Sequence, residues 1–322
     1  MVACAAAIGV IQFSPRFPQP TTPSVLAADS VRLLPFIAQA ADELLGRSGG
    51  LRLESALPGA AVHYPLLVSG DVANIGYQWV RTADSLPLAP ARPLEGSELV
   101  APDRPGFYRL ALIQGAARSI VDELTLAVLV PFTQKRGTKL NGYTLGNYAG
   151  EARGGRGEAP TGFVEITESD LDLPLSEHVR LADFLPEDGQ TSWPRYAAVD
   201  SRLLDKLELV MAKLTEMHPK GEASGVSVDV NAGFRSPSYN RRVSKSANNS
   251  RHQHGDAIDV AIDANGDGRV SHADIPLIVR AVQAVERDYP DLKGGLGLYT
   301  SKGWSRPFVH IDTRGHTARW NG

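Results

Sequence analysis

Two histidines and one aspartate have residue types and spacing that suit a metal site. His252 and Asp259 both lie in the stretch SRHQHGDAID, residues 250–259, whose end runs into an apolar, strand-like segment. His310 lies far downstream in FVHID, where it is a polar position in an apolar strand. Two imidazoles and one carboxylate bind Zn²⁺ well, and three protein ligands leave a fourth position open for water. An open position is typical of a catalytic zinc site rather than a structural one.

The pattern around these residues is more specific than a histidine-rich loop, which is usually a solvated turn. The motif S-x-H-x-x-G-x-A-x-D occupies residues 250–259, GFRSP precedes it at residues 233–237, and VHID follows it near the C-terminus. This C-terminal part of the chain resembles the M15-type zinc D-alanyl-D-alanine peptidases. They belong to a wider group that includes lysostaphin-type peptidases and the hedgehog signalling domain.

The resemblance implies an α+β zinc peptidase domain with a small antiparallel sheet over residues 163–322. It implies a peptidoglycan stem peptide as the substrate, cleaved next to D-amino acids by a D,D-carboxypeptidase or endopeptidase in cell-wall remodelling. Two alternatives stay open: a non-catalytic, zinc-containing cell-wall binding module, and a hydrolase of another small peptide such as a D,D-dipeptide. The zinc ligands that the resemblance implies are His252, Asp259 and His310.

The residue that moves a proton is not where the resemblance implies it. Many relatives place an acidic general base three residues before the last zinc histidine, and here that position is Pro307, which cannot move a proton. Asp312 is the nearest replacement, either as general base or as a carboxylate that orients a zinc histidine. His254 is a further candidate for proton transfer or oxyanion stabilisation.

Three further side chains are candidates for substrate contact. Arg235 follows a predicted strand, and by resemblance it contacts the substrate; the alternative is an arginine that pins a loop through backbone carbonyls. Arg314 is a candidate for binding a substrate carboxylate, or else a surface arginine. Tyr299 offers a hydroxyl to substrate, or else is a core tyrosine. It lies in a glycine-rich strand, residues 294–300, where glycines suggest close approach of another backbone or a ligand.

A second metal motif follows the first directly. Residues 263–274 match a twelve-residue calcium loop, although its last position is aspartate where glutamate is usual. The predicted calcium role is structural, because the loop continues the strand that carries Asp259. The segment before the loop is a strand, so this is one loop ahead of one helix and not a paired EF-hand. The predicted ligands are the side chains of Asp263, Asn265, Asp267, Ser271 and Asp274 and the carbonyl of Arg269.

Composition excludes several other classes of protein. A chain of 322 residues with ordinary apolar content can bury a sizeable core and is expected to hold two domains. Its net charge of −3 gives no basic field for nucleic acid or anionic lipid. The single cysteine, Cys4, excludes disulfides, cysteine-cluster zinc sites and, in practice, a cysteine nucleophile.

Residues 1–30 are predicted to be a signal-like segment followed by a spacer. The apolar start resembles the central region of a secretory signal, although it lacks a preceding basic residue. Val2-Ala3-Cys4 also resembles the end of a lipoprotein signal, which would make a lipidated Cys4 the one means of membrane anchoring. The alternative is the N-terminal segment of a cytoplasmic protein. We expect an exported protein of the periplasm or cell envelope.

Residues 31–132 are predicted to form a helix and an all-β, immunoglobulin-like domain. Apolar spacing favours a helix from Ser30 to Leu45, and Tyr108 after a glycine resembles the tyrosine corner of such domains. The expected strands are residues 61–68, 75–80, 106–113 and 124–130.

The remaining boundaries follow from glycine content and periodicity. Residues 133–162, rich in glycine, lysine and arginine, are predicted to be a connector with a solvated loop. Within residues 163–322 we expect helices at 200–218 and 273–286, with strands at 163–166, 226–232, 257–262 and 294–300 and a last strand from Phe308.

Overall fold

The computed structural model describes residues 36–40, 45–64, 66–70, 73–94, 98–151, 159–218, 225–244, 246–300 and 303–322. Cys4, the apolar N-terminal segment and the proline-rich run after it lie outside these residues. Within them, few helices are combined with several separate sheets, which is compatible with an α+β fold. None of the helices in this part of the chain has the combined length and apolarity of a membrane-spanning segment.

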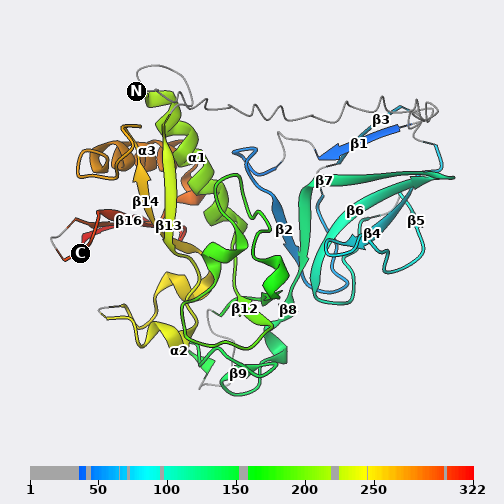
Figure 1. The fold of residues 1–322 in the computed structure, drawn as a ribbon, viewed down its shortest axis with the longest axis horizontal. Coiled ribbons are helices and arrows are strands. Elements are labelled where there is room, and N and C mark those ends of the chain that lie inside the picture. Colours follow the sequence, from blue (N-terminus) through cyan, green and yellow to red (C-terminus); the bar gives the residue numbers. More distant parts are fainter. Residues whose placement is uncertain are drawn as a thin grey trace, which may run out of the picture. The chain divides into compact units, whose positions relative to one another are not determined.

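The described elements up to Pro131 are strands, and helices and short helical turns are interspersed with strands from Phe132 onward (Figure 1). The helices are α1 (Ser201–Met217), α2 (Pro237–Asn240) and α3 (Ile275–Asp288), with 3₁₀ turns η2 (Phe132–Gln134), η4 (Glu168–Asp170), η5 (Leu181–Phe184), η6 (Arg251–His254) and η7 (Pro290–Leu292). The strands are β1 (Phe36–Ala40), β2 (Leu53–Ala56), β3 (Leu66–Gly70), β4 (Gly76–Arg81), β5 (Arg92–Pro93), β6 (Gly106–Gln114), β7 (Ala117–Val128), β8 (Val130–Pro131), β9 (Lys139–Leu140), β10 (Tyr143–Thr144), β11 (Gly162–Ile166), β12 (Arg195–Ala197), β13 (Ser227–Ala232), β14 (Ala257–Asp263), β15 (Gly295–Tyr299), β16 (Phe308–Asp312) and β17 (Ala318–Asn321).

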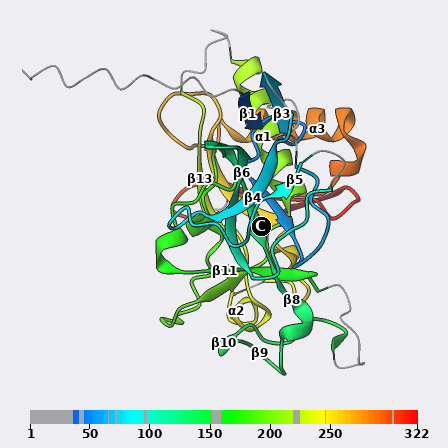
Figure 2. The ribbon, with the colours of Figure 1, turned by 90° about the vertical axis from the view of Figure 1, so that its right-hand side faces the viewer.

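The N-terminal half of the described chain is built on a five-stranded sheet in the order β2-β7-β6-β4-β5. Figure 2 shows β4 and β6 side by side, and they pair antiparallel along the whole of β4. Three expected strands are confirmed as β4, β6 and β7. The strand expected at residues 61–68 begins only at Leu66, because Ala61 forms an isolated bridge with Val100 instead.

The helix expected from Ser30 to Leu45 is wrong where the structure describes the chain. Residues Phe36 to Ala40 form β1, which pairs antiparallel with β3. Phe36 and Ala38 are both buried, which is the two-residue alternation of a strand. Pairing with a distant strand has overridden a weak local helical pattern.

The segment expected to be a solvated connector contributes to the core. Leu140, Tyr143, Leu145 and Tyr148 are all buried, with at most 4% of each residue exposed. An Asn141-Gly142 turn with positive φ at both residues joins β9 to β10, which is the usual chemistry of a tight hairpin. Gly142 therefore forms a turn between two strands that each place an apolar side chain in the core.

The C-terminal half is organised around a second five-stranded sheet in the order β13-β14-β16-β15-β17. All its pairings are antiparallel except that of β15 with β17, so the sheet is mixed rather than purely antiparallel. Strand β16 was expected to be the last strand, but β17 follows it. This strand of four residues alternates apolar and polar side chains, but it is too short for that pattern alone to predict it.

Two helices pack against each other and against this sheet (Figure 1). Helix α1 begins after Asp200, whose carboxylate accepts a hydrogen bond of 2.9 Å from the Arg202 backbone N–H, as expected for an N-cap. Lys206 of α1 is fully buried, and its Nζ donates to Glu286 Oε1 of α3 and to the Asp312 carbonyl, both at 2.8 Å. One ammonium group therefore joins both helices to the end of β16.

Replacing Lys206 by Met is expected to lower the free energy of unfolding by about 2 kcal/mol, because the buried Glu286 carboxylate loses Lys206 and keeps Arg319 as its cationic partner. Urea denaturation measures this loss. The matched control is Lys213→Met in the same helix, whose partner Glu216 is exposed, and its cost is expected to stay below about 1 kcal/mol. Equal losses in the two variants would contradict the importance of the buried pair.

Candidate metal centre

Three ligand atoms from separate elements meet at one point in the C-terminal half. His252 comes from η6, Asp259 from β14 and His310 from β16. The distance is 3.2 Å from His252 Nε2 to Asp259 Oδ1, 3.1 Å from His252 Nε2 to His310 Nδ1, and 2.9 Å from His310 Nδ1 to Asp259 Oδ1. The three side chains proposed from the sequence are therefore brought together, and this group could hold a metal ion.

The backbone explains why they meet. Asp259 and His310 are directly paired residues of the antiparallel strands β14 and β16, so their side chains leave the same face of the sheet. His252 reaches them because η6 ends at Gly255, which has a left-handed φ of 75°. A side chain there would collide with the chain beside it, since an added Cβ would lie 2.4 Å from the Ala198 carbonyl oxygen.

Hydrogen bonds on the outer side of each ring set the tautomers. His252 Nδ1 lies 2.6 Å from the Gly233 carbonyl oxygen, and His310 Nε2 lies 3.0 Å from Asp312 Oδ2. Both partners accept hydrogen bonds, so both outer nitrogens carry the hydrogen. In neutral imidazoles the inward nitrogens then present lone pairs toward Asp259 Oδ1. Three atoms that direct lone pairs toward one another can act together as ligands to a cation.

The dimensions of this set fit a small divalent metal. Bonds of roughly 2.0–2.2 Å at tetrahedral angles place ligand atoms about 3.4 Å apart, so the observed spacing needs an expansion of only a few tenths of an ångström. All three residues are buried, with at most 6% exposed. Burial also lowers the pKa of His252, which favours the neutral ring that a metal requires. Burial acts the same way on His310, but hydrogen bonds to Asp259 and Asp312 outweigh it and raise the pKa of His310, so a metal would have to displace a proton there.

Asp312 lies behind His310 rather than at the centre. It is fully buried and accepts hydrogen bonds from His310 Nε2, from the Gly295 backbone N–H at 2.7 Å and from the Arg314 guanidinium. Although burial opposes ionisation, these donors hold the pKa of Asp312 well below its usual range. Of the two expected roles, this geometry favours orientation of His310 over proton transfer.

Arg235 forms an ion pair with the metal-facing carboxylate. Its Nη2 donates to Asp259 Oδ2, while Asp259 Oδ1 faces the histidines. Its backbone N–H also donates to the His252 carbonyl at 3.1 Å, so the GFRSP segment supports two ligands. The GFRSP motif therefore lies beside the centre because Gly233 contacts His252 and Arg235 contacts Asp259.

The other candidates lie at different distances from the ligands. His254 Nε2 is 3.1 Å from Asn249 Oδ1, and its ring lies 6.1 Å from the ring of Tyr148, not among the converging atoms. The ring of Tyr299 stacks on the ring of Phe308, with 4.5 Å between the two ring centroids. Its hydroxyl accepts a 3.2 Å hydrogen bond from Trp320 Nε1.

Trp320 is a site residue that sequence reasoning missed. Its ring lies 5.1 Å from that of His310, and the Arg314 guanidinium lies over it at 5.4 Å. The glycines in β15 make room for these groups: a Cβ at Gly297 would lie 2.4 Å from Trp320, and one at Gly295 would lie 2.3 Å from Asp312 Oδ2. Close approach of side chains, not of substrate, accounts for those glycines.

A second group of potential ligand atoms comprises Glu177, His178 and Glu208. His178 Nδ1 lies 2.6 Å from Glu208 Oε2, and the His178 backbone N–H donates to Glu208 Oε1 at 2.9 Å. The hydrogen bond to Glu208 raises the pKa of His178. Both glutamate oxygens are thus engaged, and the arrangement is an ion pair that holds this segment on α1.

The predicted calcium loop is closed by backbone hydrogen bonds to its carboxylates. Asp263 accepts from the N–H groups of Asp267 and Gly268, at 3.2 and 2.7 Å. Asp274 is fully buried and accepts from the backbone N–H of Ala264 at 2.8 Å and of Ser271 at 2.7 Å. Among the described residues, the ligand atoms of these carboxylates do not lie close enough together to form a group that could hold a metal ion.

Comparisons with known proteins add no relative to this picture. No protein-family model, curated protein or solved structure matches the chain. The interpretation of the centre therefore depends on the positions of its own side chains. The strongest of these observations is that two fixed tautomers and one carboxylate direct three acceptor atoms to a single point.

Replacing Asp312 by Asn is expected to weaken zinc binding roughly 10- to 100-fold, because His310 loses the charged partner that orients it. Competition with a chromogenic chelator measures the affinity. The control is Asp188→Asn, which removes another buried carboxylate that pairs with an arginine, Arg195, away from the centre. An equal loss in both variants would show general destabilisation instead.

Proposed function

We propose that residues 163–322 form a zinc peptidase domain that hydrolyses peptidoglycan stem peptides next to D-amino acids, as a D,D-carboxypeptidase or an endopeptidase. The observation that carries this proposal is the convergence of His252, Asp259 and His310 with their lone pairs directed inward. Two imidazoles and one carboxylate are a common zinc donor set in hydrolases. The resemblance of the motifs around them supplies the substrate class.

The surrounding residues have separable tasks in this proposal. A zinc ion bound there supplies Lewis acidity to a substrate carbonyl and to water. Gly233 and Asp312 keep both histidines in the ligating tautomer. Arg235 holds Asp259, and its remaining N–H groups are available to a substrate carboxylate or carbonyl. Arg314 and Tyr299 are placed around Trp320, where they would contact a bound peptide.

A non-catalytic, zinc-containing cell-wall binding module is the second candidate. It is favoured by Pro307, which stands where an acidic base is expected, and by the engagement of Asp312 with His310 and Arg314. In the described part of the chain, Asp259 is the one carboxylate within the converging group. Metal binding without turnover is consistent with these contacts.

Mass spectrometry of defined muropeptides and purified sacculi after incubation with the zinc-loaded protein separates the two candidates. We expect loss of a terminal D-alanine or conversion of cross-linked dimers to monomers, abolished by a chelator and restored by zinc. The control is His252→Ala, which removes one ligand. Binding to sacculi with every mass unchanged would contradict the peptidase and support the binding module. Cleavage confined to free D,D-dipeptides would instead indicate a dipeptidase.

The rest of the chain fits an envelope protein in the same proposal. We propose an immunoglobulin-like β domain before the peptidase, supported by Tyr108, whose hydroxyl donates to the Arg104 carbonyl at 2.9 Å in the manner of a tyrosine corner. Trp79 is buried in the same region. Export to the periplasm or cell envelope, with a lipidated Cys4 as membrane anchor, follows from the proposed substrate, and no nucleic-acid partner is proposed.

We also propose that residues 263–274 bind calcium in a structural role. The loop continues β14, which carries Asp259, and the Asn265 carbonyl lies 3.3 Å from His218 Nε2 just after α1. Calcium would replace some of the backbone donors that now contact Asp263 and Asp274. Ordering the loop would then steady both the end of α1 and the strand beside the centre.

Calcium at 100 times its dissociation constant is expected to stabilise the zinc-saturated protein by about 2.7 kcal/mol, seen as a rise in the thermal midpoint. Asp267→Ala should abolish this rise, because it removes a predicted ligand whose carboxylate accepts hydrogen bonds from the Arg269 backbone N–H and the Asn265 side-chain amide. The control is His272→Ala, an exposed loop residue that is not a predicted ligand. An unchanged midpoint in wild type would contradict the calcium site.

A further inference from the structure

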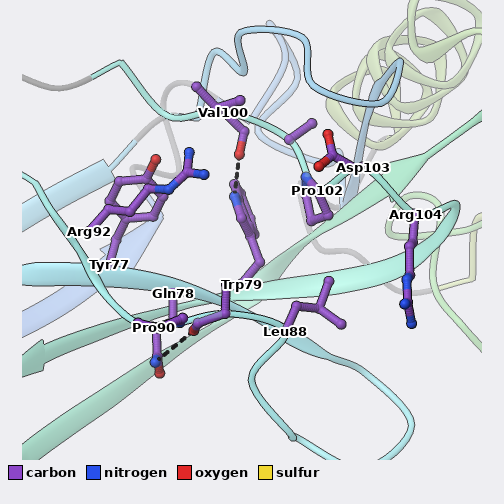
Figure 3. A pocket seen from close by; sticks show the side chains of 12 residues that line it. Tyr77, Gln78, Trp79, Leu88, Pro90, Arg92, Val100, Pro102, Asp103 and Arg104 are labelled. Atoms are coloured by element: carbon purple, nitrogen blue, oxygen red, sulfur yellow. Dashed lines mark hydrogen bonds between the residues drawn. The ribbon is translucent and has the colours of Figure 1, made fainter.

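A pocket in the N-terminal half of the described chain lies outside the metal centre and has no role in the proposed hydrolysis. Its volume is about 300 Å³, at the low end of the roughly 300–1,000 Å³ of small-ligand sites. Figure 3 shows Trp79 in its middle, with Arg92 and Arg104 on opposite sides. Its lining residues are Tyr77, Gln78, Trp79, Leu88, Ala89, Pro90, Arg92, Val100, Ala101, Pro102, Asp103 and Arg104.

The arginines of this pocket differ from the others in the surrounding sheet. Arg81 pairs with Asp84, Arg109 pairs with Asp122, and Arg118 donates to the Ser85 carbonyl at 2.9 Å. In the described part of the chain, the guanidinium groups of Arg92 and Arg104 make no hydrogen bond or ion pair, and both residues are exposed. Two guanidinium groups without a partner among the described residues, one from β5 and one from the segment before β6, therefore line the same pocket.

One unpaired anion stands beside them. Asp103 is exposed, and its carboxylate likewise has no hydrogen bond or ion pair within the described residues. It lies near Pro102 in Figure 3, on the side of the pocket where Arg104 is drawn. The two guanidinium groups can donate hydrogen bonds to an anion, and the Asp103 carboxylate can accept them from a cation. Because two positive charges face one negative charge, the lining favours an anion.

The walls between these charges restrict what can bind. Leu88, Pro90, Val100 and Pro102 are apolar, and they suit small aliphatic groups. Trp79 and Tyr77 are only 7% and 3% exposed, and the Trp79 indole is anchored to the Val100 carbonyl at 2.7 Å. Their ring faces are therefore covered and cannot serve as stacking platforms for a sugar. The carboxylate of Asp103 opposes a polyphosphate.

We propose that this pocket binds the carboxylate end of a short peptide with small side chains. Arg92 or Arg104 takes the terminal carboxylate through a charge-assisted, forked pair of hydrogen bonds. Asp103 takes the amino group of a peptide short enough to span the pocket, and the apolar walls hold the side chains. This inference stands on the N-terminal pocket alone and does not depend on metal binding or hydrolysis at the other site.

The test is isothermal titration of the full chain, made metal-free with a chelator, with trialanine as the probe. The same titration uses trialanine with an amidated C-terminus and trialanine with an acetylated N-terminus. We expect saturable binding of trialanine, and binding at least about tenfold weaker for the amide, because it lacks the charge that the guanidinium recognises. The acetylated peptide is expected to bind more weakly than trialanine, since it cannot pair with Asp103.

Variants locate the binding. Arg92→Gln and Arg104→Gln are each titrated with trialanine, and at least one is expected to weaken binding about tenfold. Arg118→Gln, which removes the same charge from the same sheet outside the pocket, should leave the affinity within about twofold. His252→Ala should retain binding, which separates this site from the metal centre even if the hydrolytic proposal fails.

Several outcomes would overturn the inference. These are no binding of trialanine at millimolar concentration, equal binding of the acid and the amide, an equal loss in Arg118→Gln, or loss of binding in His252→Ala. Inorganic phosphate or a peptidoglycan glycan fragment that competes for Arg92 more tightly than trialanine would assign the pocket to a different ligand class. Circular dichroism of each variant confirms that a lost affinity is not a lost fold.

Discussion

Three buried acceptor atoms held against one another are the constraint on which the C-terminal half depends. When both rings are neutral and both outer nitrogens carry the hydrogen, Asp259, His252 and His310 cannot satisfy one another by hydrogen bonding. Unpaired buried acceptors are costly, so the arrangement persists because each ligand has a rigid partner behind it. The Gly233 carbonyl holds one ring, Asp312 holds the other, and Arg235 holds the carboxylate.

Asp312 connects this centre to the helical layer. Its carboxylate faces His310 while its carbonyl accepts from Lys206, which is itself paired with Glu286 of α3. A shift of α1 relative to α3 would therefore act on the strand that carries a ligand. The same crowding explains Gly294, where an added Cβ would lie 1.7 Å from the Asp312 carbonyl oxygen. Asp312 thus takes part both in the packing of the helices and in the orientation of the ligand His310.

The parts that could be predicted from sequence are those determined by neighbours along the chain. Asp259 and His310 each interrupt an apolar strand, and a polar residue in such a place needs a partner. The parts that could not be predicted depend on distant pairings. Phe36 to Ala40 joins β3 against its helical spacing, and Trp320 reaches His310 only through a parallel pairing of β17 with β15. The local sequence pattern does not identify the distant strand with which either segment pairs.

Metal binding and proton transfer are separate properties of this site. The contacts that make Asp312 a good support for His310 also make it a poor base, since donors on both its oxygens stabilise the carboxylate and hold its pKa low. A general base must also reach the point where the three ligand atoms converge. His310 Nδ1 faces that point, whereas Asp312 contacts Nε2 on the opposite side of the ring. With Pro307 in the expected acidic position, the same fold could hold a metal ion whether or not another group supplies turnover.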